Sequence, residues 1–208
     1  MQRFVERCAA LVPGVLFFVP FFVLGAVGGC AKSNLASSAT TLNYLDHGRM
    51  AATQVTDPVN GVGTLAVTDD RADDMRGGTR KGEKDGSTAE IAINGDAAAW
   101  VAAGARHVFG GAGIGFDDGP IEMRIRLVEF SLEESVYVNS SYTSRVTLEV
   151  RLYNDGEEVW LGTRSGQAGN FGRPAKQENY EETFNHALSK ALDMILQDAA
   201  FRAVFKAG

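Results

Sequence analysis

The chain has 208 residues, with 20 basic and 26 acidic side chains and a formal net charge of −6 at pH 7. A mildly acidic chain lacks the basic face that a phosphate backbone requires, so nucleic acid is not expected as a partner. The length suits one domain with an additional leader and linker. Only two cysteines are present, which excludes a disulfide framework and a cysteine-rich metal site.

Residues 1–29 have the layout of a secretory signal peptide. Two arginines lie near the start, residues 11–29 carry no charge, and small residues close the segment. An uncleaved transmembrane helix is the alternative, because an apolar run of this length can span a bilayer. Pro13 and Pro20 disfavour a regular helix. We therefore predict a cleaved signal peptide.

The end of this leader, Val27-Gly28-Gly29-Cys30, resembles the lipobox of bacterial lipoproteins. The resemblance implies cleavage between Gly29 and Cys30 and transfer of a diacylglyceryl group to the Cys30 thiol. Buried acyl chains, at about 0.8 kcal/mol per CH₂, would then hold the mature protein on a membrane. An ordinary structural cysteine is the alternative. Ala31-Lys32 replace the aspartate that marks inner-membrane retention in such signals, which implies the outer membrane and its periplasmic face.

Residues 30–60 are predicted to form the lipidated cysteine and a flexible tether. The segment is rich in Ser, Thr, Ala and Asn and shows no sustained periodicity. Leu42, Tyr44 and Leu45 are its candidates for docking on the folded domain. Residues 61–208 are then assigned to one periplasmic domain.

Period-two patterns predict the strands of this domain. They cover residues 63–71, 89–93 and 120–130, with a bulge expected after Val128. Residues 144–166 predict a hairpin that turns at Asn154-Asp155-Gly156. On its returning strand we expect Val159, Leu161 and Thr163 to face inward and Trp160 to face outward.

Residues 72–88 are predicted to be a polar loop. Aspartates at its start suggest calcium as an alternative, but their spacing does not match an EF-hand loop and arginines lie among them. A solvated loop is the preferred interpretation. The aspartates in question are Asp69, Asp70, Asp73 and Asp74.

Helical periodicity predicts one helix after the second strand and two at the C-terminal end. Asn94 or Asp96 can cap the first helix, and Gly110-Gly111 can end it. Asn179 and Glu182 suggest a capping box for the second, and Asp198 can cap the third. A partner-binding face is an alternative role for the apolar stripe of the second helix, but a core face is preferred. That stripe consists of Phe184, Ala187, Leu188, Ala191, Leu192 and Ile195.

The order of these elements predicts an α+β fold. Clean alternation over 120–130 indicates a sheet with one buried face and one solvated face. We therefore expect a two-layer sandwich, with a mainly antiparallel sheet and two helices on one face.

No catalytic, metal-binding or cofactor-binding motif is recognised, so a non-enzymatic protein is predicted. His47, His107 and His186 lie in separate segments without neighbouring ligands. Residues 110–115 are glycine-rich but follow a helix, whereas a dinucleotide loop follows a strand. A ligand-binding module, with this connector and Trp100 lining a pocket, is a further alternative. Trp100 is preferred as a core residue.

The complete arrangement resembles the YajG family of outer-membrane lipoproteins. The resemblance is carried by the lipobox, "LAVTDDR", the helix "DAAAWVAAGARHVF", the pair Gly115-Phe116, three strands and a closing "LQDAAFRAVF". It covers the signal and about residues 63–208. It implies location and architecture, and it implies no reaction and no site residue beyond Cys30.

The expected function is that of a non-catalytic, lipid-anchored envelope lipoprotein. Its partners would be membrane lipid, through acylated Cys30, and another envelope protein. One alternative is the auxiliary lipoprotein of an ABC-type transport system. A second is an envelope enzyme acting on glycan or lipid, for which His107, His186 and the aspartates at 69, 70, 73 and 74 would be the candidate catalytic residues.

Overall fold

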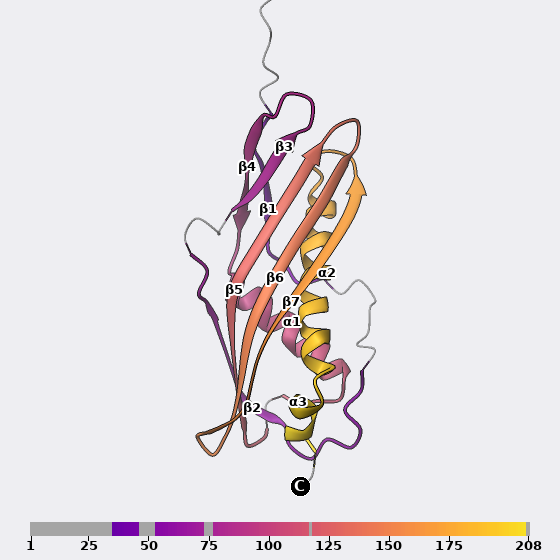
Figure 1. Cartoon of the computed structure of the whole chain (residues 1–208). Coiled ribbons are helices and arrows are strands. Elements are labelled where there is room, and N and C mark those ends of the chain that lie inside the picture. The colour runs from indigo at the N-terminus through magenta and orange to yellow at the C-terminus, as the bar shows by residue number, and fades with distance from the viewer. Residues whose placement is uncertain (1–34, 46–52, 73–76, 117, 207–208) are drawn as a thin grey trace, which may run out of the picture. The chain divides into compact units, whose positions relative to one another are not determined.

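Seven strands and three helices occur among the residues that the computed structural model describes, which are 35–45, 53–72, 77–116 and 118–206 (Figure 1). All of them belong to one structural unit, Lys32–Gly208. In chain order the elements are β1 (Ser38–Thr41), β2 (Val62–Asp69), β3 (Gly78–Gly82), β4 (Thr88–Asn94), α1 (Ala97–Gly111), β5 (Ile121–Val136), β6 (Ser140–Asn154), β7 (Glu157–Gly172), α2 (Gln177–Leu196) and α3 (Ala199–Val204).

The strands form one mixed sheet in the order β1-β4-β3-β5-β6-β7, with β2 paired to β5 beside this path. One edge of β5 is shared, because β2 pairs with its first half and β3 with its last residues. Both of these pairings are parallel, as is β1 with β4. The other three pairings are antiparallel. The two parallel pairs of β5 are joined through the α1 crossover, because β2 and β3 precede α1 and β5 follows it.

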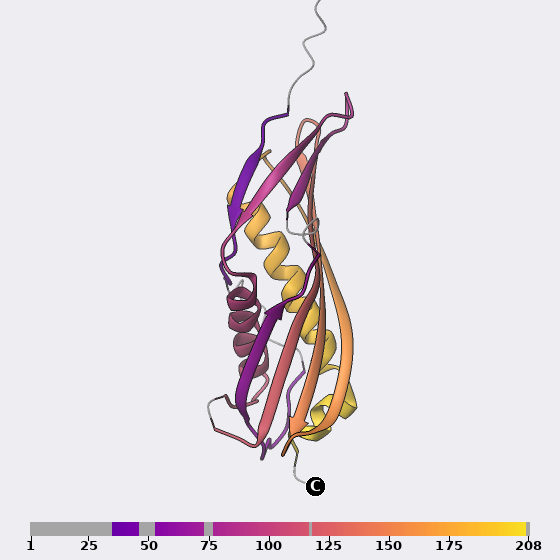
Figure 2. The same cartoon turned by 90° about the vertical axis from the view of Figure 1, so that its left-hand side faces the viewer.

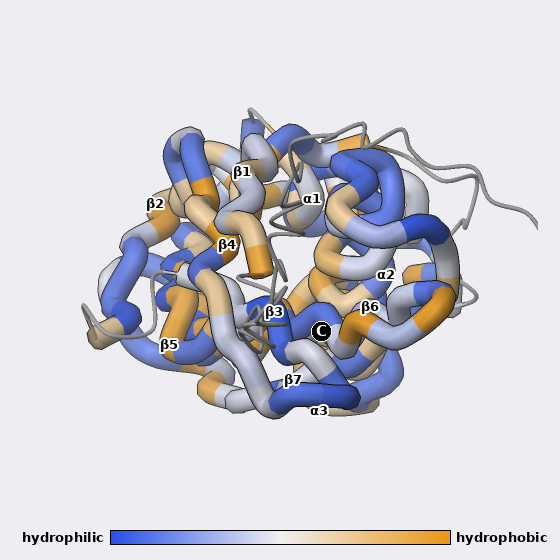
Figure 3. Tube along the Cα trace, turned by 90° about the horizontal axis from the view of Figure 1, so that it is seen from above, coloured by the Kyte–Doolittle hydropathy of each residue, from blue (hydrophilic) through white to orange (hydrophobic). Residues whose placement is uncertain are grey.

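The predicted α+β fold is confirmed. α1 and α2 lie on the same side of the sheet (Figure 2), and α3 contacts β7 and α2. Alternate residues of β5 and β6 are buried beneath the helices, and the residues between them face solvent. Figure 3 accordingly shows hydrophobic and hydrophilic residues mixed along the strands. We call the helix-covered side the inner face and the solvated side the outer face.

The core lies between the inner face and the helices. The apolar stripe of α2 is completely buried, which confirms its interpretation as a core face. Gly166 of β7 allows α2 to approach, since a Cβ there would lie 2.1 Å from the carbonyl oxygen of Ala187. Trp100 is buried against the rings of Phe130 and Phe184, which confirms it as a core residue.

Two β-bulges determine which residues of the long strands face the core. The register shifts between Leu127 and Glu129, so the bulge predicted after Val128 is confirmed. A second shift in the β6–β7 ladder leaves Val159 as an extra residue, because Tyr153 pairs with Glu158 and Leu152 with Trp160. An extra residue reverses which side chains face the core.

The facing predicted for the returning strand of the hairpin was therefore wrong. Trp160 points inward, is 8% exposed and contacts the ring of Phe201 edge-on. Val159 and Leu161 are about half exposed. The turn itself is confirmed, because Asp155 and Gly156 both have positive φ, as a two-residue hairpin turn requires.

The helix ends match the predictions in part. Asp96 caps α1 and Asp198 caps α3, each accepting backbone N–H hydrogen bonds. α1 includes Gly110 and Gly111, and Gly113 is the residue that takes positive φ. The capping box at Asn179 was wrong. α2 begins at Gln177, and the Asn179 side chain instead donates to the carbonyl of Arg173.

Two segments predicted to lack regular structure are partly built into the sheet. Within the tether predicted over 30–60, residues 38–41 form β1, and Leu42 and Val55 are buried. Docking of Leu42 and Tyr44 is confirmed, whereas Leu45 remains exposed. Within the loop predicted over 72–88, residues 78–82 form β3. Both strands are short and polar, and their pairing partners rather than their own patterns fix them as strands.

Candidate functional site

Cys30 and Gly29, the predicted lipidation and cleavage residues, lie outside the described residues. The same is true of His47, Asp73 and Asp74. The signal peptide, its cleavage and the lipid anchor therefore stay predictions from the sequence.

Each described candidate for catalysis has a different contact partner. The centroids of the His107 and Tyr44 rings lie 5.4 Å apart with the rings tilted by 46°, and His186 lies 4.0 Å from Glu182 on α2. Asp69 forms an ion pair with Arg71 at 2.7 Å, and Asp70 is bound by Arg126. Within residues 35–45, 53–72, 77–116 and 118–206, no group of three His, Cys, Asp or Glu side chains could hold a metal ion.

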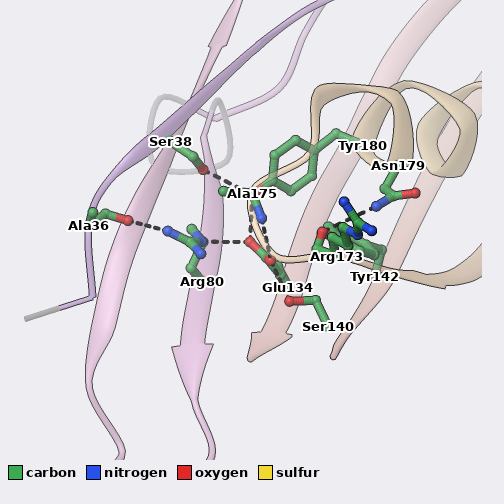
Figure 4. A network of polar contacts seen from close by, with 10 residues as sticks. All are labelled: Ala36, Ser38, Arg80, Glu134, Ser140, Tyr142, Arg173, Ala175, Asn179 and Tyr180. Atoms are coloured by element: carbon green, nitrogen blue, oxygen red, sulfur yellow. Dashed lines mark hydrogen bonds and ion pairs between the residues drawn. The ribbon is translucent and has the colours of Figure 1, made fainter. Parts of the chain in front are cut away.

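A carboxylate that sequence patterns did not single out lies at the centre of a buried polar cluster (Figure 4). Glu134 of β5 is completely buried. Arg80 of β3 lies opposite it in the parallel register, and Ser140 begins β6 across the β5–β6 turn. Tyr180 reaches the same carboxylate from the first turn of α2. We call Arg80, Glu134, Ser140 and Tyr180 the Glu134 cluster.

Four donors occupy the two oxygens of the Glu134 carboxylate. Arg80 Nε and Tyr180 Oη donate to Oε2 at 2.6 and 2.5 Å. Ser140 Oγ and the backbone N–H of Ala175 donate to Oε1 at 2.6 and 2.9 Å. Such complete satisfaction is what a carboxylate needs to remain charged away from water.

The electrostatics follow from this geometry. Burial raises the pKa of Glu134, but the hydrogen bonds from Ser140, Tyr180, Ala175 and Arg80 outweigh it and hold the pKa below its ordinary value. Burial and the bond to Glu134 raise the pKa of the Tyr180 hydroxyl. Glu134 is thus a buried anion with every hydrogen-bonding position in use. It cannot serve as a general base without losing one of these partners.

The Glu134 cluster also holds the start of the described chain. A second nitrogen of Arg80, Nη1, donates to the carbonyl oxygen of Ala36, just before β1. Ser38 Oγ lies 3.0 Å from Tyr180 Oη, so β1 and α2 share a contact as well. Through these bonds the cluster joins β1, β3, β5, β6 and α2 at one end of the sheet. Its arrangement can fasten the N-terminal segment in place.

The outer face carries a different kind of charge arrangement, on β2, β5 and β6. Arg126 lies between two carboxylates, Asp70 at 2.5 Å and Glu149 at 3.0 Å. Arg151 contacts the same Glu149 at 3.1 Å. Arg124 stacks over the Tyr153 ring at 4.5 Å. The three arginines, Asp70 and Tyr153 line an open depression of about 360 Å³, and we call Arg124, Arg126 and Arg151 the arginine ladder.

A second depression, of about 470 Å³, lies on the same face of the sheet, where β3, β5, β6 and β7 meet. Its lining is mainly polar and includes Thr79, Ser131, Glu133, Thr143, Arg145 and Gln167. Both depressions are therefore on the side of the sheet that the helices leave open. The alternation over 120–130 had already predicted a wet face with Arg124 and Arg126.

Neither a protein-family model nor a curated protein sequence matches the chain. Solved structures that match the chain include a Xanthomonas campestris protein assigned to the family DUF330, with 11% identity, a TM-score of 0.47 and coverage of 81% of this chain and 97% of that chain. A Caulobacter crescentus protein described as a lipoprotein has 16% identity, a TM-score of 0.38 and coverage of 54% and 87%. A minor lipoprotein from Acinetobacter baumannii has 9% identity, a TM-score of 0.34 and coverage of 67% and 92%.

Two of these three proteins are named as lipoproteins. In the described part of this chain, no helix is both long enough and apolar enough to cross a membrane.

Proposed function

We propose that the protein is a non-catalytic lipoprotein of the outer membrane, held by acylated Cys30 and facing the periplasm, and that its outer sheet face binds another envelope protein. The observation that carries the binding role is the uncovered outer face with its arginine ladder and two depressions. Guanidinium groups that stay near solvent keep donors available for a partner's carboxylates. The lipid anchor rests on the lipobox resemblance.

A tether to the membrane supports this role physically. A domain held at a bilayer meets other envelope proteins at a high effective concentration, so a modest binding face suffices. Charged groups that stay in water steer association and set specificity more than they add affinity. The exposed pairs of the arginine ladder fit that use, whereas the fully bonded Glu134 cluster fits a structural one.

Site-specific photo-cross-linking in intact cells tests the proposal. A photo-reactive amino acid replaces Thr143, which is exposed in the second depression, and the matched control replaces Met194, which is exposed on α2 on the helix side. We expect a discrete adduct with an envelope protein from position 143 and none from position 194. Mass spectrometry of the adduct would identify the partner. Components of a transport system would specify the accessory role.

The same experiment with Cys30→Ser separates the anchor from the binding face. We expect the Cys30→Ser protein to leave the outer-membrane fraction and to lose most of the adduct from position 143. A wild type that fractionates with the membrane but yields the same adducts from positions 143 and 194 would contradict the binding face. A Cys30→Ser protein that stays in the membrane fraction would contradict the lipid anchor.

A further inference from the structure

Three of the exposed apolar side chains gather at one end of the sheet. Tyr137 and Val138, in the turn between β5 and β6, are 57% and 74% exposed, and Phe171 near the end of β7 is 80% exposed. Phe171 pairs with Ser141, which follows the turn on the neighbouring strand. The three side chains therefore lie at the same end of the neighbouring strands β5, β6 and β7. We call Tyr137, Val138 and Phe171 the apolar tip.

The adjoining turn between β3 and β4 supports the apolar tip. Gly82 pairs with Val136, and the backbone N–H of Glu83 donates to the carbonyl of Val136. Lys84 Nζ lies 5.3 Å from the centroid of the Tyr137 ring, a cation–π contact. Asp85 turns its carboxylate back onto Ser87. The exposed ring of Tyr137 is thus in contact with the turn between β3 and β4.

The described chain begins at this same end. Ala36 is bound to Arg80, which lies opposite Glu134, so residue 35 is level with the last residues of β5 (Figure 1). The last helix, α3, lies at the opposite end. Four residues separate Leu35 from Cys30, and the five Cα–Cα steps between them can span at most about 18 Å. A bilayer that holds Cys30 therefore holds the apolar tip within reach of its surface.

We propose that the apolar tip inserts into the interfacial layer of the bilayer that carries the Cys30 lipid, so that the domain has a fixed orientation on the membrane. This inference rests on the lipid anchor of the proposed function. Aromatic side chains favour the membrane–water interface, where the ring is buried and a polar end stays wet. The Lys84 amine, which lies over the Tyr137 ring, adds a positive group that would meet the lipid headgroups there.

Apolar contact rather than charge carries this docking. Glu83 and Asp85 flank Lys84 in the same turn, so the turn has no strong net attraction to anionic lipid. The contact should therefore persist when ionic strength is raised, because salt screens surface charges but does not weaken apolar burial. With the apolar tip in the bilayer, the strands point away from the membrane and carry the outer face into the periplasm.

The test uses the full lipidated protein purified from cells and reconstituted into phosphatidylethanolamine and phosphatidylglycerol vesicles. An environment-sensitive dye is attached to Val138→Cys, and the matched control is Glu157→Cys at the opposite end of the sheet. The engineered thiol is the only free one, because Cys8 leaves with the signal and Cys30 is acylated. We expect a blue-shifted emission and quenching by nitroxide lipids at position 138, in low and high salt, and neither at position 157.

A second variant tests the side chains themselves. Replacing Tyr137 and Phe171 by serine in the Val138→Cys protein should abolish the blue shift while the protein still floats with the vesicles. An unchanged shift would mean that these side chains are not the contact, which overturns the proposal. Both changes are at exposed positions, so folding is not at risk.

Flotation distinguishes the two failures. If the protein floats but the dye at position 138 reports a water-exposed environment, the lipid anchor stands and the tip proposal is overturned. This holds whether the apolar tip binds a protein or has no partner. If the protein does not float, the lipid anchor fails and the tip proposal fails with it. Equal quenching at positions 138 and 157 would show the domain lying flat, which also overturns the proposed orientation.

Discussion

The Glu134 cluster and the arginine ladder use the same chemistry in opposite surroundings. The Arg80–Glu134 pair is 2.6 Å long with side chains 6% and 0% exposed, and the Arg126–Asp70 pair is 2.5 Å long with side chains 44% and 35% exposed. The two ion pairs have similar N–O distances but contribute differently to stability. The buried pair has lost its hydration and depends on every remaining hydrogen bond, whereas water screens and competes for the exposed pair. The first can fasten elements together, and the second can exchange partners.

Removing Arg80 should have the largest effect. Arg80→Met leaves Glu134 as a buried charge without its cation and frees the Ala36 carbonyl, so we expect a loss of about 3–5 kcal/mol in the free energy of unfolding. The matched control is Lys81→Met on the same strand, whose ion pair with Glu133 is exposed. That change should cost between about 0 and 1 kcal/mol. Denaturant titration of both variants measures the difference.

A double variant sharpens this test. Arg80→Met combined with Glu134→Leu removes both charges, and it should recover part of the stability lost in Arg80→Met alone. Equal stability of Arg80→Met and Lys81→Met would show that the cluster is not held by its ion pair.

The second-largest effect is expected from acid, which should weaken the Glu134 cluster. The pKa of Glu134 is lower in the folded protein than its ordinary value near 4.5, so the folded state binds the proton less readily than the unfolded state. Its contribution to stability is therefore complete above about pH 4.5 and is lost as the pH falls through the lowered value. The free energy of unfolding, measured from pH 6 downwards, should decline more steeply for the wild type than for Glu134→Gln. Parallel curves for the two proteins would contradict this account.

The arginine ladder should show the smallest effect on stability. We expect Arg126→Ala to leave the melting temperature unchanged within error, because both of its ion pairs are open to solvent. The same change should weaken the cross-linked adduct from position 143 if the outer face is the binding face. A large drop in melting temperature would show that the ladder is a structural element like the Glu134 cluster.

Local patterns predicted the elements whose partners are close in sequence. The stripe from Phe184 to Ile195 repeats at the helical period, and its burial against the sheet needed no further information. The turn at Asp155-Gly156 is specified by residues that accept positive φ. The wet side of β5, with Arg124 and Arg126, was predicted by simple alternation.

The Glu134 cluster could not be predicted in the same way. Its members come from four elements, and Arg80 lies in a segment with so many polar residues that a loop was the natural prediction. One signal was present in the sequence. After the bulge, Phe130, Leu132 and Glu134 share the inward phase, so an acidic side chain was due to point into the core and to need partners. Which residues supply them depends on how distant strands align.

The sequence by itself determined the helices, the central hairpin, the wet face of the sheet and the prediction of a lipidated Cys30, since each depends on residues that are neighbours along the chain. Only the tertiary structure decided that β1 and β3 are strands and that Trp160 points inward. It also decided that Arg80 meets Glu134 and that Phe171 pairs with Ser141, at the end of the sheet where Tyr137 lies in a turn. The physical reason is that pairing register and burial are properties of contacts between distant segments, and a single inserted residue such as Val159 reverses them without changing the local pattern.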